Sequence, residues 1–495
     1  MTRAEIQTVY EAGPEAVFTL VESLLVTITQ QQALLEQQQA AIASLTARVQ
    51  QLENQLATRS HNSSKPPSSD GFAKKTQSRR QKSGKKPGGQ PGHPGQTLRM
   101  VPDPQHTVTH FPERCPGCDA PLAAVPATDV EARQVFEVVF TPLEVTEHQV
   151  GTKQCPRCGC AARGAFPAGV TQPVQYGPRL LALLVYLVVY QLLPLQRTRE
   201  LLQDLFGAAV GEGTLVTAVE RCCTGLAATA AQIQAALREA PWVGFDETGV
   251  RINGQLQWWH TASTATLTHY HVHAKRGRAG IEAGEILPGF VGRAVHDAWS
   301  PYFAYECEHA LCNAHHLREL TYLVEREGQE WAAALIGLLG EAHEQVEAAR
   351  AAGAGELDAL TLATIEAEYR RILATGWATN PPARPERPPP AARQRGRPAQ
   401  SKAQNLLGRL SRYERETLAF VYDFAVPFDN NQAERDLRML KVQQKISGGF
   451  RSGAGAHGFG RIRGYLATMR KQAQPLLAAI ENVFHGHPVV PSLSG

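Results

Sequence analysis

A seven-residue apolar repeat near the amino end constrains the fold more than any other feature of the chain. Six aliphatic residues recur every seven positions: Val21, Ile28, Leu35, Ile42, Val49 and Leu56. The slot three positions later holds leucine or glutamine: Leu24, Gln31, Gln38, Leu45 and Leu52. This spacing is typical of a coiled coil. It predicts one long helix over residues 17–58 that pairs with another copy of the chain. A lone amphipathic helix packed on its own chain is the alternative.

Basic residues gather in two irregular stretches. The 495-residue chain is 43% hydrophobic and 19% charged, with a net charge of only +4. Residues 60–99 hold nine Lys/Arg and one Asp among many Gly, Pro and Ser. We expect this stretch, including Lys85 and Lys86, to be disordered when free and to follow DNA phosphates, with a plain soluble linker as the alternative.

The second basic stretch covers residues 380–402 and is rich in Pro and Arg. Within it, Arg395-Gly-Arg397-Pro398 resembles the core of an AT-hook. Arginines that flank a glycine can enter the narrow minor groove of A·T tracts, where the negative potential is enhanced. A solvated linker is the stronger alternative for such a short match.

No export or membrane signal is evident in the sequence. The first residues, MTRAEIQTVYEAG, lack an apolar signal core. The longest apolar run, from Leu180 to Leu193, is shorter than the roughly 20 residues that span a bilayer. It predicts a buried core helix, and we expect a cytoplasmic protein.

Four cysteines form two CxxC pairs, Cys115 with Cys118 and Cys155 with Cys158. Two such pairs can place four thiolates around one Zn²⁺ ion, and the strand-like segments Val135–Phe140 and Val145–Val150 between them suggest a zinc-ribbon hairpin. A redox dithiol is the alternative, but no thioredoxin-like pattern surrounds the cysteines.

The rest of the chain alternates between helical and strand patterns. Residues 176–240 are helical, and Thr198 to Phe206 with Thr214 to Cys223 have the lengths of a helix-turn-helix, a weak signal. Strands are predicted in WVGFDETGVRI, QLQWWHTAS, LTHYHVHA and GRAVHDA. Helices return over 317–375, 402–424, 431–445 and 457–485.

Three acidic residues stand where predicted elements begin or end. Asp246 follows WVGF, Asp297 ends a second strand-like segment, and Glu434 lies in a helix that opens after Asp429. Phosphodiester hydrolysis with two divalent ions needs converging carboxylates, and hard oxygen ligands suit Mg²⁺. The order strand Asp, strand Asp, helix Glu suits an RNase H-like nuclease core. Each acid alone could equally be part of a turn.

The helix of Glu434 also has a cationic face. Arg438, Lys441 and Lys445 follow Glu434 at steps of four, three and four, so all four share one face. This face could hold a metal and grip the adjacent phosphate, and we expect Arg435 on the same helix to contact DNA. Ion pairs on a solvated face are the alternative.

Two patterns with histidine have weaker implications. Cys312-Asn-Ala-His315 offers two ligands, too few to close a zinc site, so we expect Cys312 in the core and His315 either structural or near DNA. Three histidines alternate along one predicted strand: His269, His271 and His273. A half-exposed strand edge explains them better than a metal cluster.

From Asn62 onward the chain resembles the bacterial transposases of the insertion-sequence-sixty-six family. The matching pieces are, in order, NSSKPPSSD, KKPGGQPGHPGQTL, the paired CxxC, LLPLQR, DET, HDAWSPY, CNAHHLREL and NNQAERDLR. The resemblance implies a DDE transposase with Asp246, Asp297 and Glu434 as its metal-binding triad, two Mg²⁺ (or Mn²⁺) ions and one structural Zn²⁺.

Two features depart from the family pattern. The tail from Lys445 onward, KISGGFRSGAGAHGFGRIRGYLATMRK, differs from the commonest form, which leaves open whether helper proteins encoded by the same element take part. The 136 residues between Asp297 and Glu434 exceed what a compact core needs, so residues 317–425 should be a helical insertion.

These observations predict a multidomain α+β protein. Its segments are a coiled-coil helix (1–60), a basic linker (61–99), a zinc-binding domain (100–165), a helical region (166–240), an RNase H-like α/β core in two parts (241–316 and 426–495) and an all-helical insertion (317–425). We expect a transposase that binds the terminal inverted repeats of an insertion sequence, cuts double-stranded DNA and joins the 3′-OH ends to a target. A non-catalytic zinc-containing DNA-binding protein and a nuclease that only hydrolyses DNA are the alternatives.

Overall fold

The computed structural model describes residues 2–59, 61–63, 99–136, 143–158, 160–382 and 400–493. The chain forms two compact units, and each is built from three separate stretches of the sequence. The first comprises Met1–Gln77, Arg238–Asp246 and Leu287–Glu434, and the second comprises Ser78–Leu237, Glu247–Ile286 and Arg435–Gly495. Lys85, Lys86, Arg395 and Arg397 lie outside the described residues, so their expected roles stay predictions. No helix in the described segments is long and apolar enough to cross a membrane.

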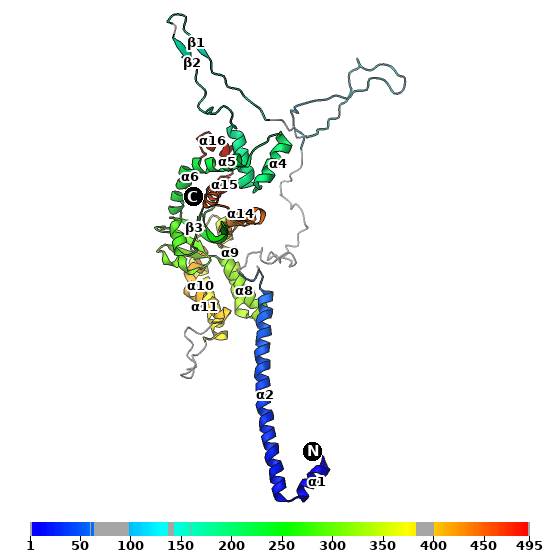
Figure 1. The fold of residues 1–495 in the computed structure, drawn as a ribbon, viewed down its shortest axis with the longest axis vertical. Coiled ribbons are helices and arrows are strands. Elements are labelled where there is room, and N and C mark those ends of the chain that lie inside the picture. Colours follow the sequence, from blue (N-terminus) through cyan, green and yellow to red (C-terminus); the bar gives the residue numbers. More distant parts are fainter. Residues whose placement is uncertain are drawn as a thin grey trace. The chain divides into compact units, whose positions relative to one another are not determined.

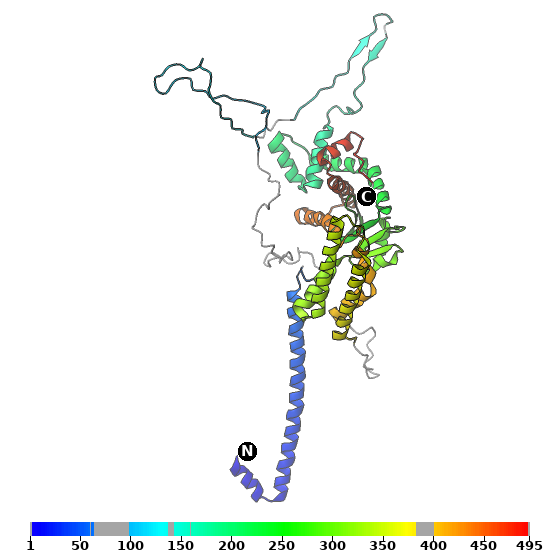
Figure 2. The ribbon, with the colours of Figure 1, turned by 180° about the vertical axis from the view of Figure 1, so that it is seen from behind.

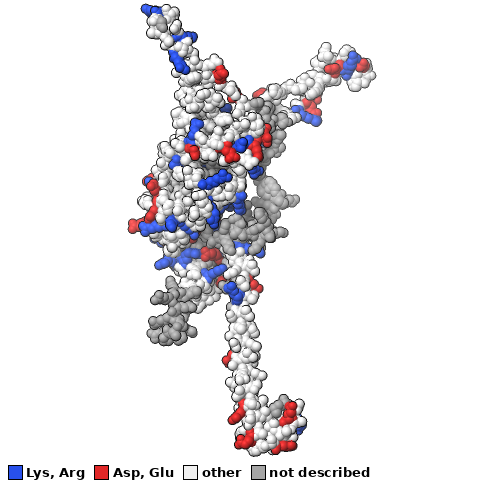
Figure 3. Space-filling view, viewed as in Figure 1, with Lys and Arg blue, Asp and Glu red and all other residues white. Residues whose placement is uncertain are grey.

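The predicted amino-terminal helix is present. A short helix α1 (Arg3–Glu11), capped by Thr2, precedes α2 (Pro14–Ala57), which is 44 residues long (Figures 1 and 2). The seam residues of the seven-residue repeat are exposed within the single chain; Ile42, for example, is 63% exposed. Figure 3 shows few charged side chains along α2. The helix is therefore confirmed, whereas its pairing with another copy stays a prediction.

The sheet has the hydrogen-bonded order β5-β4-β3-β6-β7, and β3 (Trp242–Ile252) contributes to both units. In the first unit β3 pairs in parallel with β6 (Arg293–His296), which pairs in parallel with β7 (Glu308–Leu311). A 3₁₀ helix, η3 (Ser300–Ala304), links β6 to β7. In the second unit β4 (Gln255–Ser263) pairs antiparallel with the edge strand β5 (Thr268–His273). Four strands match the predicted segments, but β7 was missed because EHAL is short and half polar.

Between β7 and the helix of Glu434, the described chain is helical, as expected for residues 317–425. The helices are α8 (Asn313–Glu327), α9 (Glu330–Ala351), α10 (Ala359–Thr379), α11 (Lys402–Arg412), α12 (Glu414–Thr417) and α13 (Ala419–Tyr422). Helices α8 to α11 lie side by side (Figures 1 and 2), and each packs on its neighbours around one apolar core. Trp331, Leu335, Tyr369 and Leu407 are buried in that core. Aliphatic and aromatic residues at helical spacing give these helices the apolar faces that they bury.

In the second unit the described residues before Pro178 are irregular apart from a short hairpin, and those from Pro178 onward are mostly helical apart from β3 to β5. It contains α3 (Pro178–Val185), the π-helix η2 (Tyr186–Tyr190), α4 (Leu195–Phe206), α5 (Glu212–Gly225), α6 (Ala227–Arg238), α7 (Arg278–Ala283), α15 (Gly453–Lys471) and α16 (Leu476–Phe484). The long apolar run is a buried segment, as predicted: Leu184, Val185 and Val189 are almost inaccessible. Helix α14 (Asn431–Ser447) begins in the first unit and continues in the second.

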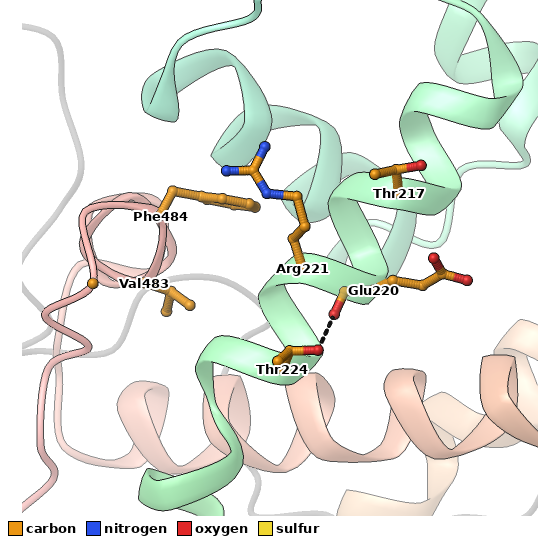
Figure 4. A pocket seen from close by; sticks show the side chains of 7 residues that line it. Thr217, Glu220, Arg221, Thr224, Val483 and Phe484 are labelled. Carbon is orange, nitrogen blue, oxygen red and sulfur yellow. Dashed lines mark hydrogen bonds between the residues drawn. The ribbon is translucent and has the colours of Figure 1, made fainter. Parts of the chain in front are cut away.

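The predicted helix-turn-helix segments are both helical, as α4 and α5. Helix α4 ends at Gly207 in the left-handed conformation, φ +63°, and Arg199 Nε donates to the Val210 oxygen in the turn at 3.0 Å. Thr217, Arg221 and Thr224 are exposed on the outer face of α5. Beside them the end of α16 forms one wall of a shallow pocket of about 350 Å³, where the Arg221 guanidinium lies 5.6 Å from the centre of the Phe484 ring (Figure 4).

The prediction of two strands between the CxxC pairs is wrong for the residues that the structure describes. Residues 143–150 form no strand, and part of the first segment, residues 137–140, lies outside the described residues. The observed hairpin is formed instead by β1 (Thr152–Gln154) and β2 (Ala161–Arg163). Val145 is 89% exposed, so it has no apolar surface on which a strand could pack. β-propensity without such a surface does not fix a strand.

Candidate active site and zinc module

The first two carboxylates lie at matching positions on neighbouring parallel strands. Gly244 of β3 is in register with Val295 of β6. Two residues further along each chain stand Asp246 and Asp297, both partly buried. In parallel strands, residues at matching register project from the same face and leave the sheet at the same edge. Continued by two residues, this register would bring Asp246, in the interior of β3, opposite Asp297, which directly follows β6.

The third carboxylate is tied to the same strand by a buried asparagine. Asn430 is 6% exposed, and its Nδ2 donates to the Phe245 oxygen of β3 at 2.7 Å. One helical turn later the Glu434 amide donates to the Asn430 oxygen at 3.2 Å. The first turn of α14 is therefore anchored one residue before Asp246. Asp429 supports this turn, because its carboxylate accepts hydrogen bonds from the Asn431 amide and side chain.

The turn after β6 holds Asp297 in a defined conformation. Ala298 has a positive φ of +68°, and the Trp299 amide donates to Asp297 Oδ1 at 3.0 Å. In the same turn the Ala298 amide donates to His296 Nδ1 at 3.2 Å, so the ring proton of His296 is on Nε2. Nε2 donates that proton to His309 Nδ1 at 3.0 Å. Burial lowers the pKa of His296 well below its usual value, so this fully buried imidazole is neutral.

The side chain of Glu434 faces the start of α8. Its Oε2 atom lies 3.4 Å from an Arg318 nitrogen, and its Oε1 atom lies 3.7 Å from His315 Nδ1. Cys312 Sγ, His315 and Glu434 all have a ligand atom within 4.8 Å of one another. Because Cys312, His315 and Arg318 are spaced by three residues, they project from one face of α8 toward the carboxylate.

Burial sets the protonation of the two neighbours of Glu434. It raises the pKa of the Cys312 thiol to about 12, so this sulfur stays protonated, and it accepts a hydrogen bond from the Asn430 amide at 3.1 Å. Burial also lowers the pKa of His315, although the nearby charges of Glu434 and Asp297 act in the opposite direction.

The residues present fit divalent metal ions. Glu434 Oε1 is buried and has no hydrogen-bond partner among the described residues, which is costly for a carboxylate unless a cation balances it. Carboxylate oxygens from Asp246, Asp297 and Glu434 form the hard donor set that Mg²⁺ and Mn²⁺ prefer. These three residues therefore fit divalent metal ions by the chemistry of their donor atoms.

Each CxxC pair forms a local knuckle in the second unit. Cys115 lies in a turn closed by a bridge between Arg114 and Pro121, and Cys155 follows β1 directly. Hydrogen bonds from the backbone of Gly117 lower the pKa of Cys115, and those from Arg157 lower the pKa of Cys155. Both knuckles thus favour the thiolate that Zn²⁺ requires. Within the described residues the two pairs do not share one ligand sphere, since the cluster at Cys312 is the only group of three metal-ligating side chains at that spacing.

The cationic face of α14 is only partly free for DNA. Lys441 Nζ donates a hydrogen bond to the Gly249 oxygen of β3 at 2.6 Å, so this amine supports the sheet in the second unit. Burial lowers the pKa of Lys441. Arg438 and Lys445 are exposed, as is Arg435. The alternative of ion pairs along one face does not describe Lys441, whose partner is a backbone carbonyl.

Sequence reasoning missed two residues of the site. Arg318 lies in the CNAHHLREL motif, and its spacing of three from His315 was the available signal. Asn430 was passed over as part of the Asp429-Asn430-Asn431 turn, because nothing in a sequence says which strand an asparagine will anchor. By contrast, the prediction of Cys312 as a core residue is confirmed by its 1% exposure. The three strand histidines lie on an edge strand, as expected. His271 Nε2 donates a hydrogen bond to the Gly280 oxygen at 2.7 Å.

Three models of known families match parts of the chain. The model described as "Transposase IS66 family" matches residues 173–458, more than half of the chain and a range that includes all three carboxylates. The model described as the zinc-finger binding domain of transposase IS66 matches residues 112–159, and a family of unknown function matches residues 15–99. No curated protein matches the chain.

Proposed function

Because the chain belongs to the IS66 transposase family, we propose that it cuts DNA at the ends of an insertion sequence and joins the freed 3′-OH ends to target DNA. The observation that supports this most is the parallel pairing of β3 with β6 two residues before Asp246 and Asp297, together with the bond that ties the Glu434 helix to β3. Strand Asp, strand Asp and helix Glu are what an RNase H-like nuclease core requires.

In this proposal the three carboxylates hold two divalent ions. When bound, such ions activate water and neutralise charge that develops on the phosphate. Asp297 is oriented by its turn, and Glu434 by Arg318 and Asn430, so neither carboxylate needs to reorganise during the reaction. Hydrolysis would break a P–O3′ bond and leave a 3′-OH and a 5′-phosphate. The 3′-OH would then attack a target phosphodiester at the same site, without a covalent protein intermediate.

The other parts of the chain have supporting roles in the proposal. A zinc ion held by Cys115, Cys118, Cys155 and Cys158 would order the module that contacts the terminal repeats, together with the helices of residues 166–240. Pairing through α2 would hold two DNA ends in one complex. The exposed cations Arg435, Arg438 and Lys445 would contact phosphates near Glu434 and release counterions. Helper proteins encoded by the same element remain an open part of the proposal.

The test uses full-length protein and duplexes of the inverted repeats that flank its gene. Asp246→Asn, Asp297→Asn and Glu434→Gln should each abolish cleavage with Mg²⁺, while binding, measured by fluorescence anisotropy, stays close to wild type. Glu306→Gln, which changes an exposed glutamate between η3 and β7, is the matched control and should cut normally.

The outcome separates the proposal from its two competitors. Near wild-type cutting by one of the three variants would remove that residue from the site. Tight binding of the repeats with no cleavage by the wild type would favour a non-catalytic DNA-binding protein. Cleavage without joining of pre-cut 3′-OH ends would favour a nuclease that only hydrolyses DNA.

A further inference from the structure

A buried imidazole and a buried carboxylate oxygen face each other at the candidate active site. His315 Nδ1 and Glu434 Oε1 lie 3.7 Å apart, and neither atom has a hydrogen-bond partner among the described residues. The distance exceeds that of an N–H···O hydrogen bond, which is about 2.7–3.2 Å. Buried polar atoms are rarely left unsatisfied, so a bridging third group is the simplest partner for two such atoms at this separation.

Neighbouring groups account for the other oxygen of Glu434 and for the nearby thiol. The second oxygen of Glu434 lies next to Arg318, at 3.4 Å. Cys312 Sγ lies within 4.8 Å of a ligand atom of each of these two residues, but this thiol is buried and already accepts a hydrogen bond from the Asn430 amide. Cys312 therefore packs against the pair and does not complete the ligand set.

We infer that His315 is a nitrogen ligand of the divalent ion that Glu434 Oε1 binds, so that one of the two ion positions has mixed nitrogen and oxygen ligands. This rests on the proposed function, because it assigns a second ligand to an ion of the same site. Mg²⁺ prefers oxygen ligands, whereas imidazole suits first-row transition-metal ions, and among these Mn²⁺ is the one that also suits carboxylate and water ligands. The position of His315 should therefore make this ion site prefer Mn²⁺.

Pulsed electron paramagnetic resonance tests the inference directly, because Mn²⁺ bound to imidazole shows coupling to a ¹⁴N nucleus. The sample is full-length protein with Mn²⁺ and a pre-cut repeat duplex. Wild type and Cys312→Ala should show the nitrogen coupling, and His315→Gln should lose it. In parallel, His315→Gln should weaken Mn²⁺ binding about tenfold and Mg²⁺ binding much less, following the ligand preferences of the two ions. His485→Gln, which removes an exposed imidazole, is the control and should leave both readouts unchanged.

Several results would overturn the inference, and most of them are measured on the wild-type protein. Wild-type protein that binds no Mn²⁺, or binds it without nitrogen coupling, excludes His315 as a ligand. Coupling that persists in His315→Gln excludes it as well. If the wild type cuts and joins DNA but shows no coupling, the inference fails and the proposed function stands. If coupling is seen but the protein neither cuts nor joins DNA, the proposed function fails and the mixed-ligand site stands.

Discussion

The bond from Asn430 to β3 offers a sharp test of how the active site is held together. Asn430→Ala removes the Nδ2 donor that contacts the Phe245 oxygen at 2.7 Å but leaves all three carboxylates in the chain. The helix of Glu434 then loses its side-chain link to the strand of Asp246. We expect DNA binding to be retained and cleavage to be lost in large part.

The magnitude follows from the burial of the bond. Asn430 is 6% exposed, so the freed carbonyl cannot recover its hydrogen bond from bulk water. Leaving a buried acceptor unsatisfied costs about 1–3 kcal/mol, and a misplacement of catalytic groups by about 1 Å can cost roughly 100-fold in rate. Because Glu434 is one turn from Asn430, we expect a cleavage rate about 100-fold below wild type, with a melting temperature lower by a few degrees.

A matched control separates this effect from the loss of any asparagine. Asn405 in α11 also donates from Nδ2 to a backbone carbonyl, that of Gln400 at 3.3 Å, but it is exposed. Asn405→Ala should change stability by no more than about 0.5 kcal/mol and leave cleavage intact. The assay is single-turnover cleavage of a repeat duplex, with a thermal melt of the same samples.

One result would refute the reasoning. If Asn430→Ala melts lower than wild type but cuts at a rate within twofold of it, the hydrogen bond stabilises the fold without positioning Glu434. The anchor of α14 would then have to lie elsewhere, and the bond between Asn430 and β3 would have no role in aligning the carboxylates.

Three further predictions concern other parts of the chain. About one zinc ion per chain should be found by elemental analysis of the purified protein, and Cys115→Ser should lower that content, whereas an unchanged content would exclude this thiol as a ligand. Ile42→Asp places a charge in the exposed seam of α2 and should reduce the oligomeric state of the full chain in sedimentation, whereas Ala40→Asp, outside the seam, should not; a monomeric wild type at tens of micromolar would contradict the coiled coil. The stacked rings of His260 and His271 are buried, which lowers the pKa of each to about 4. Because the unfolded chain binds more protons between pH 6.5 and 4, stability should fall as the pH falls through this window, and a melting temperature that is flat across it would contradict the burial.

Local features of this protein could be predicted from sequence because their cause is local. The length of α2 follows from its seven-residue repeat and the absence of Gly and Pro after its first residue, Pro14. The extents of β3 and β4 followed from apolar and β-branched runs around the turn Asn253-Gly254, whose φ angles of +48° and +73° suit a two-residue hairpin. The sequence also predicted the helical character of the described part of residues 317–425, because the apolar residues there recur at helical spacing. The three acids were identified by their places at the ends of such segments, and by the family motifs around them.

Tertiary structure alone decided what each acid faces. Whether Asp246 lies beside Asp297 depends on the register of two strands separated by some forty residues of β4, β5 and α7, and a shift by one residue would point one carboxylate to the other face. In the same way, only the packing of α8 against the first turn of α14 brings His315 and Arg318 to Glu434, which lies more than a hundred residues further along the chain. The strands expected near Val145 did not form, because a strand needs a partner and an apolar surface that no local pattern supplies. Sequence periodicity sets which side of an element is apolar, whereas the contacts between elements, and hence the ligands of the site, depend on long-range packing.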